Sequence, residues 1–349
     1  MRPEGQAGAA ERIREFLGCE VECALQPDAA GQFKRLVDAG LDRIPLPASG
    51  YTMERWQALA AVGEVDLSLA KLYEGHTDAL AIMAELGCLH LAEAGSSWGV
   101  WAAESPQGRL TCHAAQGSTL LLQGRKYWGS GAGVASHALV TAWGADSDQP
   151  QLVSVALDQP GIGVDRSRWA AVGMAGSGSF NVTFEGAIAN PLGNPGDYLA
   201  RAGFWQGGGG IAACWFGGCR AIAGALQNTL ESSPDSARGP LRMAALGRVA
   251  LAMHSAACVL RTSARWIDDN PAGNAMAAAL QARLGVELCA KEVLSVVGGT
   301  LGATPFCTQA HFARVAADLP VFLRQSHGEL DFAALGGLAL AVGQKHGWL

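Results

Sequence analysis

Residues 124–131 read Gly-Arg-Lys-Tyr-Trp-Gly-Ser-Gly, and they lie between two strand-like stretches, Ser118–Gln123 and His137–Trp143. The segment places an indole, Trp128, two residues before a hydroxyl, Ser130. In an extended strand, residues i and i+2 share one face. We therefore expect one side of this strand to offer an aromatic edge and a hydrogen-bond donor, which suits a flat heterocyclic cofactor. The alternative is a hairpin strand with a half-buried Trp, a common position for this side chain.

The composition is that of a folded protein with a large core. The chain has 349 residues, of which 49% are hydrophobic and 16% are charged. This length allows two or three packed layers or domains, and this composition favours a core over disorder. The net charge is −6 and no block of Lys and Arg occurs. These features argue against a nucleic-acid partner or an anionic membrane surface.

The cysteines predict free thiols rather than a metal site. There are nine, an odd number, and no Cys-x-x-Cys occurs. Most have apolar neighbours, which indicates buried thiols in a reducing cytoplasm. The eight His residues do not cluster with the cysteines at ligand spacing, so we expect no metal.

No signal peptide or membrane span is expected. The N-terminus is polar and lacks the apolar stretch of a secretory signal. The longest apolar run, Ile211–Leu226, is interrupted by Arg220 and diluted by Gly. We interpret it as too polar to span a membrane and as a buried core helix.

The chain divides into three predicted parts. Residues 1–95 are expected to be a helical domain, with helices over Ala9–Leu17 and Gln32–Ala39, a third capped by Thr52, and a fourth through Glu85. Residues 96–203 form a middle β-domain that ends in a Pro/Gly-rich connector. Residues 204–349 form a C-terminal helical bundle.

Short β-rich runs and long helices distinguish the last two parts. The runs Leu120–Gln123, Ala138–Trp143, Leu152–Leu157 and Phe180–Phe184 predict a small β-barrel or sandwich. Helices are expected at about 209–231, 236–268, 273–297, 307–325 and 330–345, with breaks at Gly298-Gly299 and Pro305. The expected fold class is therefore α+β: an N-terminal helical domain, a small β-barrel or sandwich, and a C-terminal four-helix bundle.

This order of domains and four motifs resemble the acyl-CoA dehydrogenase superfamily of flavoproteins. The resemblance covers nearly the whole chain. It rests on Trp101–Pro106, Leu122–Gly131, Trp169–Phe184, and Val297–Gly302 followed by Arg314 and Asp318. Each motif alone is weak, but the four occur in the family's order on the expected types of element.

The resemblance implies bound FAD and names residues at the flavin ring. Ser130 stands where the family places a hydroxyl beside flavin N5, and Trp128 where it places a packing indole. The backbone N–H groups of Ala102 and Ala103 would face the pyrimidine edge.

The resemblance also implies an oligomer. Gly298 and Gly299 lack Cβ atoms, so a backbone can approach a pyrophosphate or ribose closely. In the family this contact comes from a neighbouring subunit. We therefore expect a homodimer or homotetramer.

The family's catalytic carboxylate has no clear match. In the family a Glu beyond the Arg-Asp pair removes an α-proton from the substrate. The corresponding position here falls near Ser326 or His327, and the nearest carboxylate, Glu329, lies further along. Glu329 and His327 are thus the catalytic candidates.

Three functions remain open on these residues. The first is an FAD-dependent acyl-CoA dehydrogenase, which would pass a hydride from an acyl-CoA or related small molecule to N5 and then electrons to an electron-transfer flavoprotein. The second is a flavin-dependent monooxygenase that uses Ser130 and His327 and needs a flavin reductase. The third is a catalytically silent paralogue that serves as a structural subunit.

Other polar residues are expected to be structural. We interpret His76 as a satisfied polar group rather than as a residue of the acyl pocket. Arg314, Asp318 and Arg324 are expected to form an ion-pair network at one end of the bundle.

Overall fold

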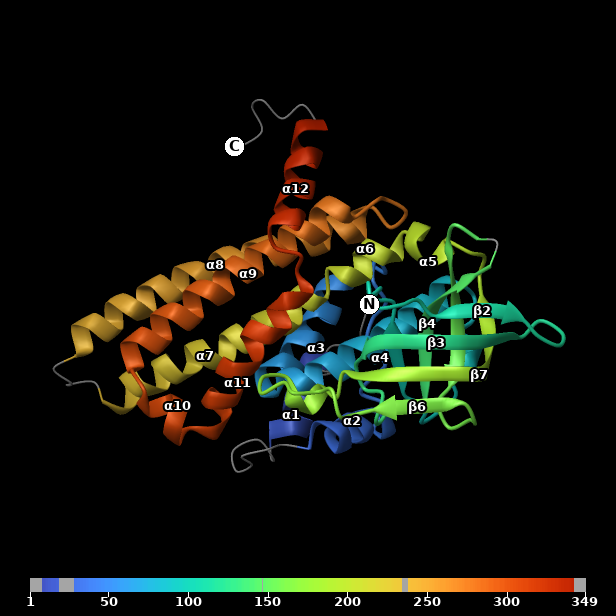
Figure 1. Ribbon diagram of the computed structural model, residues 1–349. Coiled ribbons are helices and arrows are strands. Elements are labelled where there is room, and N and C mark those ends of the chain that lie inside the picture. Colours follow the sequence, from blue (N-terminus) through green and yellow to red (C-terminus); the bar gives the residue numbers. More distant parts are fainter. Residues whose placement is uncertain (1–7, 19–27, 146, 234–237, 342–349) are drawn as a thin grey trace. The chain divides into compact units, whose positions relative to one another are not determined.

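The computed structural model describes residues 8–18, 28–145, 147–233 and 238–341 (Figure 1). The chain divides into two compact units. The helical unit comprises Met1–Pro27, Pro45–Leu67 and Trp205–Leu349, and the barrel unit comprises Asp28–Ile44 and Ser68–Phe204. The N-terminal helices are thus shared between the two units. The three-part division at residues 95 and 203 stays a prediction.

The barrel unit contains a closed ring of strands. The ring runs β4–β5–β7–β3–β2 and returns to β4, while β1 pairs in parallel with β4 and β6 pairs with β7. Leu122, Val140, Val153 and Phe184 are among the buried residues inside it. The strands are β1 Trp98–Trp101, β2 Thr111–Ala114, β3 Leu120–Gly129, β4 His137–Gly144, β5 Pro150–Ala156, β6 Ile162–Asp165 and β7 Phe180–Leu192.

Helical segments also belong to the barrel unit. They are α2 Ala29–Asp38, α4 Leu67–Glu85, η1 Leu89–Leu91, η2 Ala175–Ser177 and α5 Asp197–Ala200. On α4, His76 is buried, with Nε2 3.0 Å from Asp42 Oδ2. Its Nδ1 accepts the Trp98 backbone N–H at 3.2 Å, so Nε2 carries the proton and donates to the carboxylate. The prediction that His76 is a satisfied polar group is confirmed.

The helical unit is built around three long helices. Figure 1 shows α7, α8 and α9 running alongside one another. The unit contains α1 Ala9–Gly18, α3 Thr52–Val65, α6 Gly203–Gly208, α7 Ile211–Ser232, α8 Gly239–Asp269, α9 Met276–Leu301, α10 Thr304–Thr308, α11 Ala310–Phe322, η3 Leu323–Gln325 and α12 Glu329–Ala341. The parts of the predicted helices at 236–237 and 342–345 lie outside the described residues.

The break predicted at Gly298-Gly299 was wrong, because α9 continues through both glycines to Leu301. Glycine inside a helix costs about 1 kcal/mol relative to alanine. Packing accounts for its presence here, since a Cβ on Gly298 would lie 3.2 Å from the Phe306 ring. The missing side chain leaves room for that ring.

Thr52 is not the N-cap that its sequence position predicted. Helix α3 begins at Thr52 itself, and the N-cap residue Tyr51 makes no side-chain cap bond. The cap comes instead from Asp268 on α8, whose carboxylate accepts the Thr52 hydroxyl at 2.6 Å and the Thr52 N–H at 3.0 Å. A residue more than 200 positions away supplies this acceptor.

Two arginines of the predicted ion-pair network contact carboxylates that the sequence did not suggest. Arg314 Nε lies 3.1 Å from Oδ2 of the buried Asp66, and Arg324 Nη2 lies 3.9 Å from Glu287 Oε1. Asp318 is buried. Asp66 and Glu287 thus provide carboxylates to these two arginines, and the part of Asp318 in the network stays a prediction.

His311 closes the last turn of α3 and gives a pH-dependent prediction. Its Nε2 donates toward the carbonyl oxygens of Glu64 at 3.1 Å and Val65 at 3.0 Å. Burial, and then the charge of Arg314, lower the pKa of His311 below its usual 6.5. The unfolded chain therefore binds this proton more readily, so the His311 contribution is present above about pH 6.5 and is lost as pH falls below it. We expect His311→Ala to cost about 1 kcal/mol of unfolding free energy at pH 8, measured in urea.

The matched control for that prediction is His113→Ala, because His113 is exposed on β2. The difference in stability between wild type and His311→Ala should shrink from pH 8 to pH 5. A constant difference over this range would contradict the proposed protonation state.

Two helical segments, Gly203–Ser232 and Gly239–Asp269, are long and apolar enough to cross a membrane by length and composition alone. By length and composition alone the Ile211–Leu226 stretch is thus not too polar to span, but its burial confirms the predicted core helix. Such helices are weak evidence for a membrane, because core helices pass the same test. The first segment is 67% buried, which fits a core helix, but the second is only 22% buried.

The described cysteines are free thiols. Four are buried, as predicted, and Cys88 is half-buried, whereas Cys258 and Cys307 are exposed. The buried ones are Cys112, Cys214, Cys219 and Cys289. Cys19 and Cys23 lie outside the described residues.

Candidate functional site

The strand that carries Trp128 ends in a bulge. Lys126 pairs with Val182 and Gly129 pairs with Phe180, so β3 has one more residue between these pairs than β7. Trp128 takes a left-handed backbone conformation with φ of 56°, and the residue is 56% exposed. The expected extended face shared by Trp128 and Ser130 was therefore wrong. The bulge turns the indole outward.

Neighbouring residues hold the backbone of Ser130 in place. The Trp101 indole N–H donates to the Ser130 carbonyl at 3.0 Å, and the Gly131 N–H donates to the Ser177 carbonyl at 3.0 Å. A Cβ on Gly129 would lie 3.2 Å from both the Phe180 carbonyl oxygen and the Trp101 ring. Glycine is needed there for the turn to pack this closely.

Three serine hydroxyls form a chain of hydrogen bonds, the serine chain, in which every proton points the same way along the chain. Ser177 Oγ donates to the Met174 carbonyl at 2.8 Å. Ser177 and Ser179 Oγ lie 3.0 Å apart, and Ser179 and Ser130 Oγ lie 2.8 Å apart. Each hydroxyl has one proton, so Ser179 donates to Ser177 and Ser130 donates to Ser179. Ser130 Oγ is left with lone pairs only and can act as an acceptor toward a ligand.

An open hollow of about 250 Å³ lies beside this chain. We call it the Trp128 hollow. None of the residues that line it carries a carboxylate, and two are arginines. The lining residues are Gln107, Arg125, Tyr127, Trp128, Arg168, Trp169, Ser179, Phe180 and Asn181. Such a mixture of aromatic, amide and cationic groups suits an aromatic anion.

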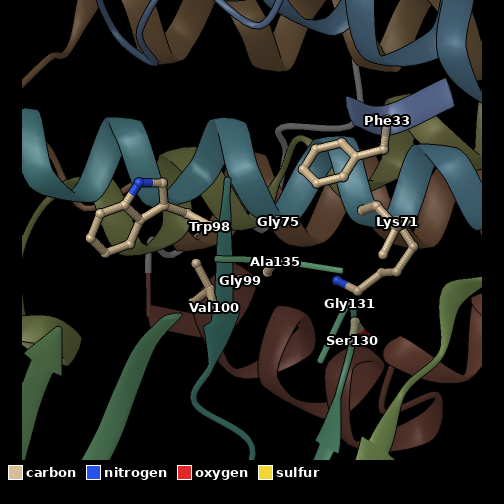
Figure 2. Close-up of a pocket in the computed structure, with 10 residues that line it drawn as sticks. Phe33, Lys71, Gly75, Trp98, Gly99, Val100, Ser130, Gly131 and Ala135 are labelled. Carbon is tan, nitrogen blue, oxygen red and sulfur yellow. The ribbon is translucent and has the colours of Figure 1, made fainter. Parts of the chain in front are cut away.

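Ser130 lines a second, narrow cavity (Figure 2). Its volume of about 10 Å³ has room for roughly one water molecule. Figure 2 shows Phe33 and Lys71 near the Ser130–Gly131 turn, with the Lys71 ammonium directed toward that turn. Lys71 Nζ also pairs with Glu74 at 2.9 Å.

A buried lysine supports the segment after β1. Lys126 Nζ donates to Glu104 Oε1 and to Thr141 Oγ1, each at 2.9 Å. Burial lowers the Lys126 pKa, and the Glu104 carboxylate opposes this effect. Glu104 directly follows Ala102 and Ala103 in the sequence. Ala102 is half-buried and Ala103 is exposed. Neither alanine lines the Trp128 hollow or the narrow cavity at Ser130. Their predicted backbone contacts to a flavin stay predictions.

The remaining predicted site residues belong to the helical unit. Gly299 lines a separate hollow of about 320 Å³ together with Arg248 and Ser295. Gly298 is next to it on α9. The proposed contact of these glycines with a partner's cofactor stays a prediction.

The two catalytic candidates lie at the start of α12. His327 is 73% exposed, with Nδ1 3.4 Å from Asp331 Oδ1. Glu329 is the exposed first residue of the helix. Both residues are in a different unit from Trp128 and Ser130, so their catalytic roles also stay predictions.

The sequence matches no protein-family model and no curated protein. Solved structures match over nearly the whole chain. KijD3, in complex with FMN and a dTDP-amino-keto sugar, has a TM-score of 0.80 and 19% identity over 97% of this chain and 94% of its own. TdsC from a Paenibacillus species, with FMN and indole, has a TM-score of 0.82 and 17% identity over 95% and 96%. The methanesulfinate monooxygenase MsuC from Pseudomonas fluorescens has a TM-score of 0.80 and 17% identity over 96% and 97%.

The chain has the acyl-CoA dehydrogenase-like fold. At these identities the likeness establishes fold alone. The predicted α+β class, with helical ends around a small β-barrel, is confirmed.

Within the acyl-CoA dehydrogenase-like fold, sequence reasoning missed Ser177 and Ser179. Both fall inside the Trp169–Phe184 segment that carried the family resemblance. The sequence signal was Ser177-Gly178-Ser179, two hydroxyls separated by a glycine that here has φ of 50°. Only the three-dimensional turn brings these hydroxyls to Ser130.

Proposed function

We propose that the protein is a flavin-dependent monooxygenase that uses FMN, in place of the acyl-CoA dehydrogenase that the sequence resemblance first favoured. The observation that carries this proposal is the serine chain, which leaves Ser130 as an acceptor and reaches the Trp128 hollow through Ser179. A flavin bears an N–H at N5 only when it is reduced. An acceptor at this position therefore favours the reduced flavin, the form that reacts with dioxygen.

The reaction class fixes the electron balance. Bound reduced FMN would supply two electrons to dioxygen, so that one oxygen atom enters the substrate and the other leaves as water. The protein's part is to bind and orient the groups. Ser130 would hold the N5 proton, and Trp128 and Trp169 would pack against the ring.

The substrate class is proposed from the solved neighbours. One of them is named a dibenzothiophene monooxygenase, and another acts on methanesulfinate. We propose a small molecule with an oxidisable sulfur or nitrogen atom, and a separate flavin reductase as electron donor. Acyl-CoA oxidation through FAD and an electron-transfer flavoprotein is the weaker reading, because the candidate base Glu329 is an exposed helix-terminal residue.

The test begins with the purified protein and FMN. We expect the protein to quench FMN fluorescence on binding and, with a flavin reductase and NADH, to oxygenate at least one member of a thioether, thiophene and amine panel. Flavin-loaded protein that is bleached anaerobically by an acyl-CoA would overturn this proposal in favour of the dehydrogenase. Protein that binds neither FMN nor FAD would favour the silent paralogue.

A homo-oligomer is proposed from the surface of α8. Leu241 and Leu251 on this helix are 72% and 69% exposed, and Leu288 on α9 is also exposed. Exposed apolar side chains gathered on one element mark an interaction surface. We propose that a second copy of the chain covers α8 in a dimer or tetramer.

We also propose a cytoplasmic location, which the buried free thiols support.

We expect Leu251→Glu to weaken this association by about tenfold or more, because a buried interface carboxylate has no partner. Size-exclusion chromatography with light scattering over a dilution series measures it. The control is Leu199→Glu, at an exposed leucine on α5, away from α8 in the sequence. Equal effects of the two substitutions, or a monomeric wild type, would contradict an α8 interface.

A further inference from the structure

Two arginines in the Trp128 hollow have no role in the serine chain. Arg125 extends from β3, and Arg168 lies in the loop after β6. Both line the hollow together with Trp128 and Trp169. Both are exposed residues, so water solvates the two guanidinium groups, and their place beside aromatic walls leaves them open to an anionic ligand.

Within the described residues, neither guanidinium takes part in a hydrogen bond or salt bridge. Other arginines of the barrel unit are engaged: Arg201 pairs with Glu85 at 2.8 Å, and Arg109 stacks on Trp143 at 4.2 Å. Arg125 and Arg168 are thus available to a ligand.

The positive charges of the two guanidinium groups stabilise one nearby carboxylate, that of Asp165. The pKa of Asp165 is held below its usual range, first by hydrogen bonds from Ser167 and then by the charges of Arg168 and Arg125. The Asp165 Oδ1 atom is engaged by the Ser167 hydroxyl at 2.6 Å and the Ser167 N–H at 3.0 Å. One negative charge near two positive charges leaves a net positive charge at the hollow.

We propose that Arg125 and Arg168 bind the phosphate of flavin mononucleotide, with the flavin ring beside the aromatic residues of the same hollow. This inference rests on the proposed function. Arginine forks match phosphate oxygens in two parallel hydrogen bonds. A terminal phosphate carries nearly two negative charges, so the pair would favour FMN over riboflavin, which has no phosphate.

The test compares ligands that differ only in the phosphate. Binding of FMN and riboflavin to the full-length protein is titrated by flavin fluorescence. We expect Arg125→Ala and Arg168→Ala each to weaken FMN binding by about tenfold, the size of one lost charge-assisted contact, and to change riboflavin binding by less than about twofold. Arg168→Lys should restore part of the FMN affinity, because it keeps the charge and loses the fork.

Arg166→Ala is the matched control. Arg166 lies in the same loop, carries the same charge and packs over Phe180 at 5.3 Å, without lining the hollow. An Arg166→Ala loss as large as that of Arg168→Ala would overturn the phosphate site, since net charge alone would explain both. Wild type that binds FMN and riboflavin equally would also overturn it, while the flavin proposal would stand. Wild type that binds neither would refute the proposed function itself.

The arginines could instead bind an anionic group of the substrate. In that case the variants will raise the substrate KM and leave FMN affinity unchanged, and this result also overturns the phosphate site.

Discussion

Replacing Ser130 with alanine is expected to reduce the product formed per dioxygen consumed by about tenfold to a hundredfold, with hydrogen peroxide released in place of product. The substitution removes the hydroxyl that the serine chain holds as an acceptor. The reduced flavin would then keep its N5 proton without a partner. Oxygen electrode measurements combined with product and peroxide assays give the ratio directly.

Two further serine variants make that prediction specific. In Ser179→Ala, Ser130 keeps its hydroxyl but can turn its proton toward the ligand, so an intermediate loss of coupling is expected. Ser154→Ala, a buried serine on β5, should leave coupling unchanged. Full coupling in Ser130→Ala would refute the role of the chain.

Replacing Glu104 with alanine is expected to destabilise the protein by about 2–3 kcal/mol, because it leaves the buried Lys126 ammonium without its counter-charge. Glu104 itself is partly exposed, so water offsets part of the loss. Lys126→Met should cost less than about 1 kcal/mol, since an apolar chain suits the same site. The combined variant should resemble Lys126→Met. Urea unfolding of the three variants measures this asymmetry.

The Glu104→Ala penalty should also depend on pH. Burial already lowers the Lys126 pKa below its usual 10.5, and loss of Glu104 removes the group that opposes this shift. Folding then favours the neutral amine, so stability rises as pH increases toward 10.5. A penalty that is equal at pH 7 and pH 10 would contradict the assignment.

The architecture could be predicted from sequence because it depends on local patterns. The helices at Ala9–Leu17 and Leu67–Glu85 and the strands near Leu120, Ala138 and Leu152 match hydrophobic periodicity, which reports burial along one element. Short strands between two helical regions then predict the fold class.

Features that depend on distant partners could not be predicted. The cap of α3 comes from Asp268, and the carboxylate for Arg314 comes from Asp66. The bulge at Trp128 depends on how β7 pairs with β3, and no spacing in the sequence encodes that register. Ser130 could therefore be proposed from the sequence, but the direction of its hydroxyl depends on Ser177 and Ser179.

The closed ring of strands has a consequence for how the barrel unit resists opening. Each of the five ring strands pairs with a neighbour on both sides over at least part of its length. Among the described strands, β1 and β6 pair with a neighbour on one side alone, and each is four residues long. Where a ring strand is paired on both sides, its fraying must break two ladders at once. The amide protons of the ring should therefore exchange with solvent together, as one cooperative unit, while those of β1 and β6 exchange earlier.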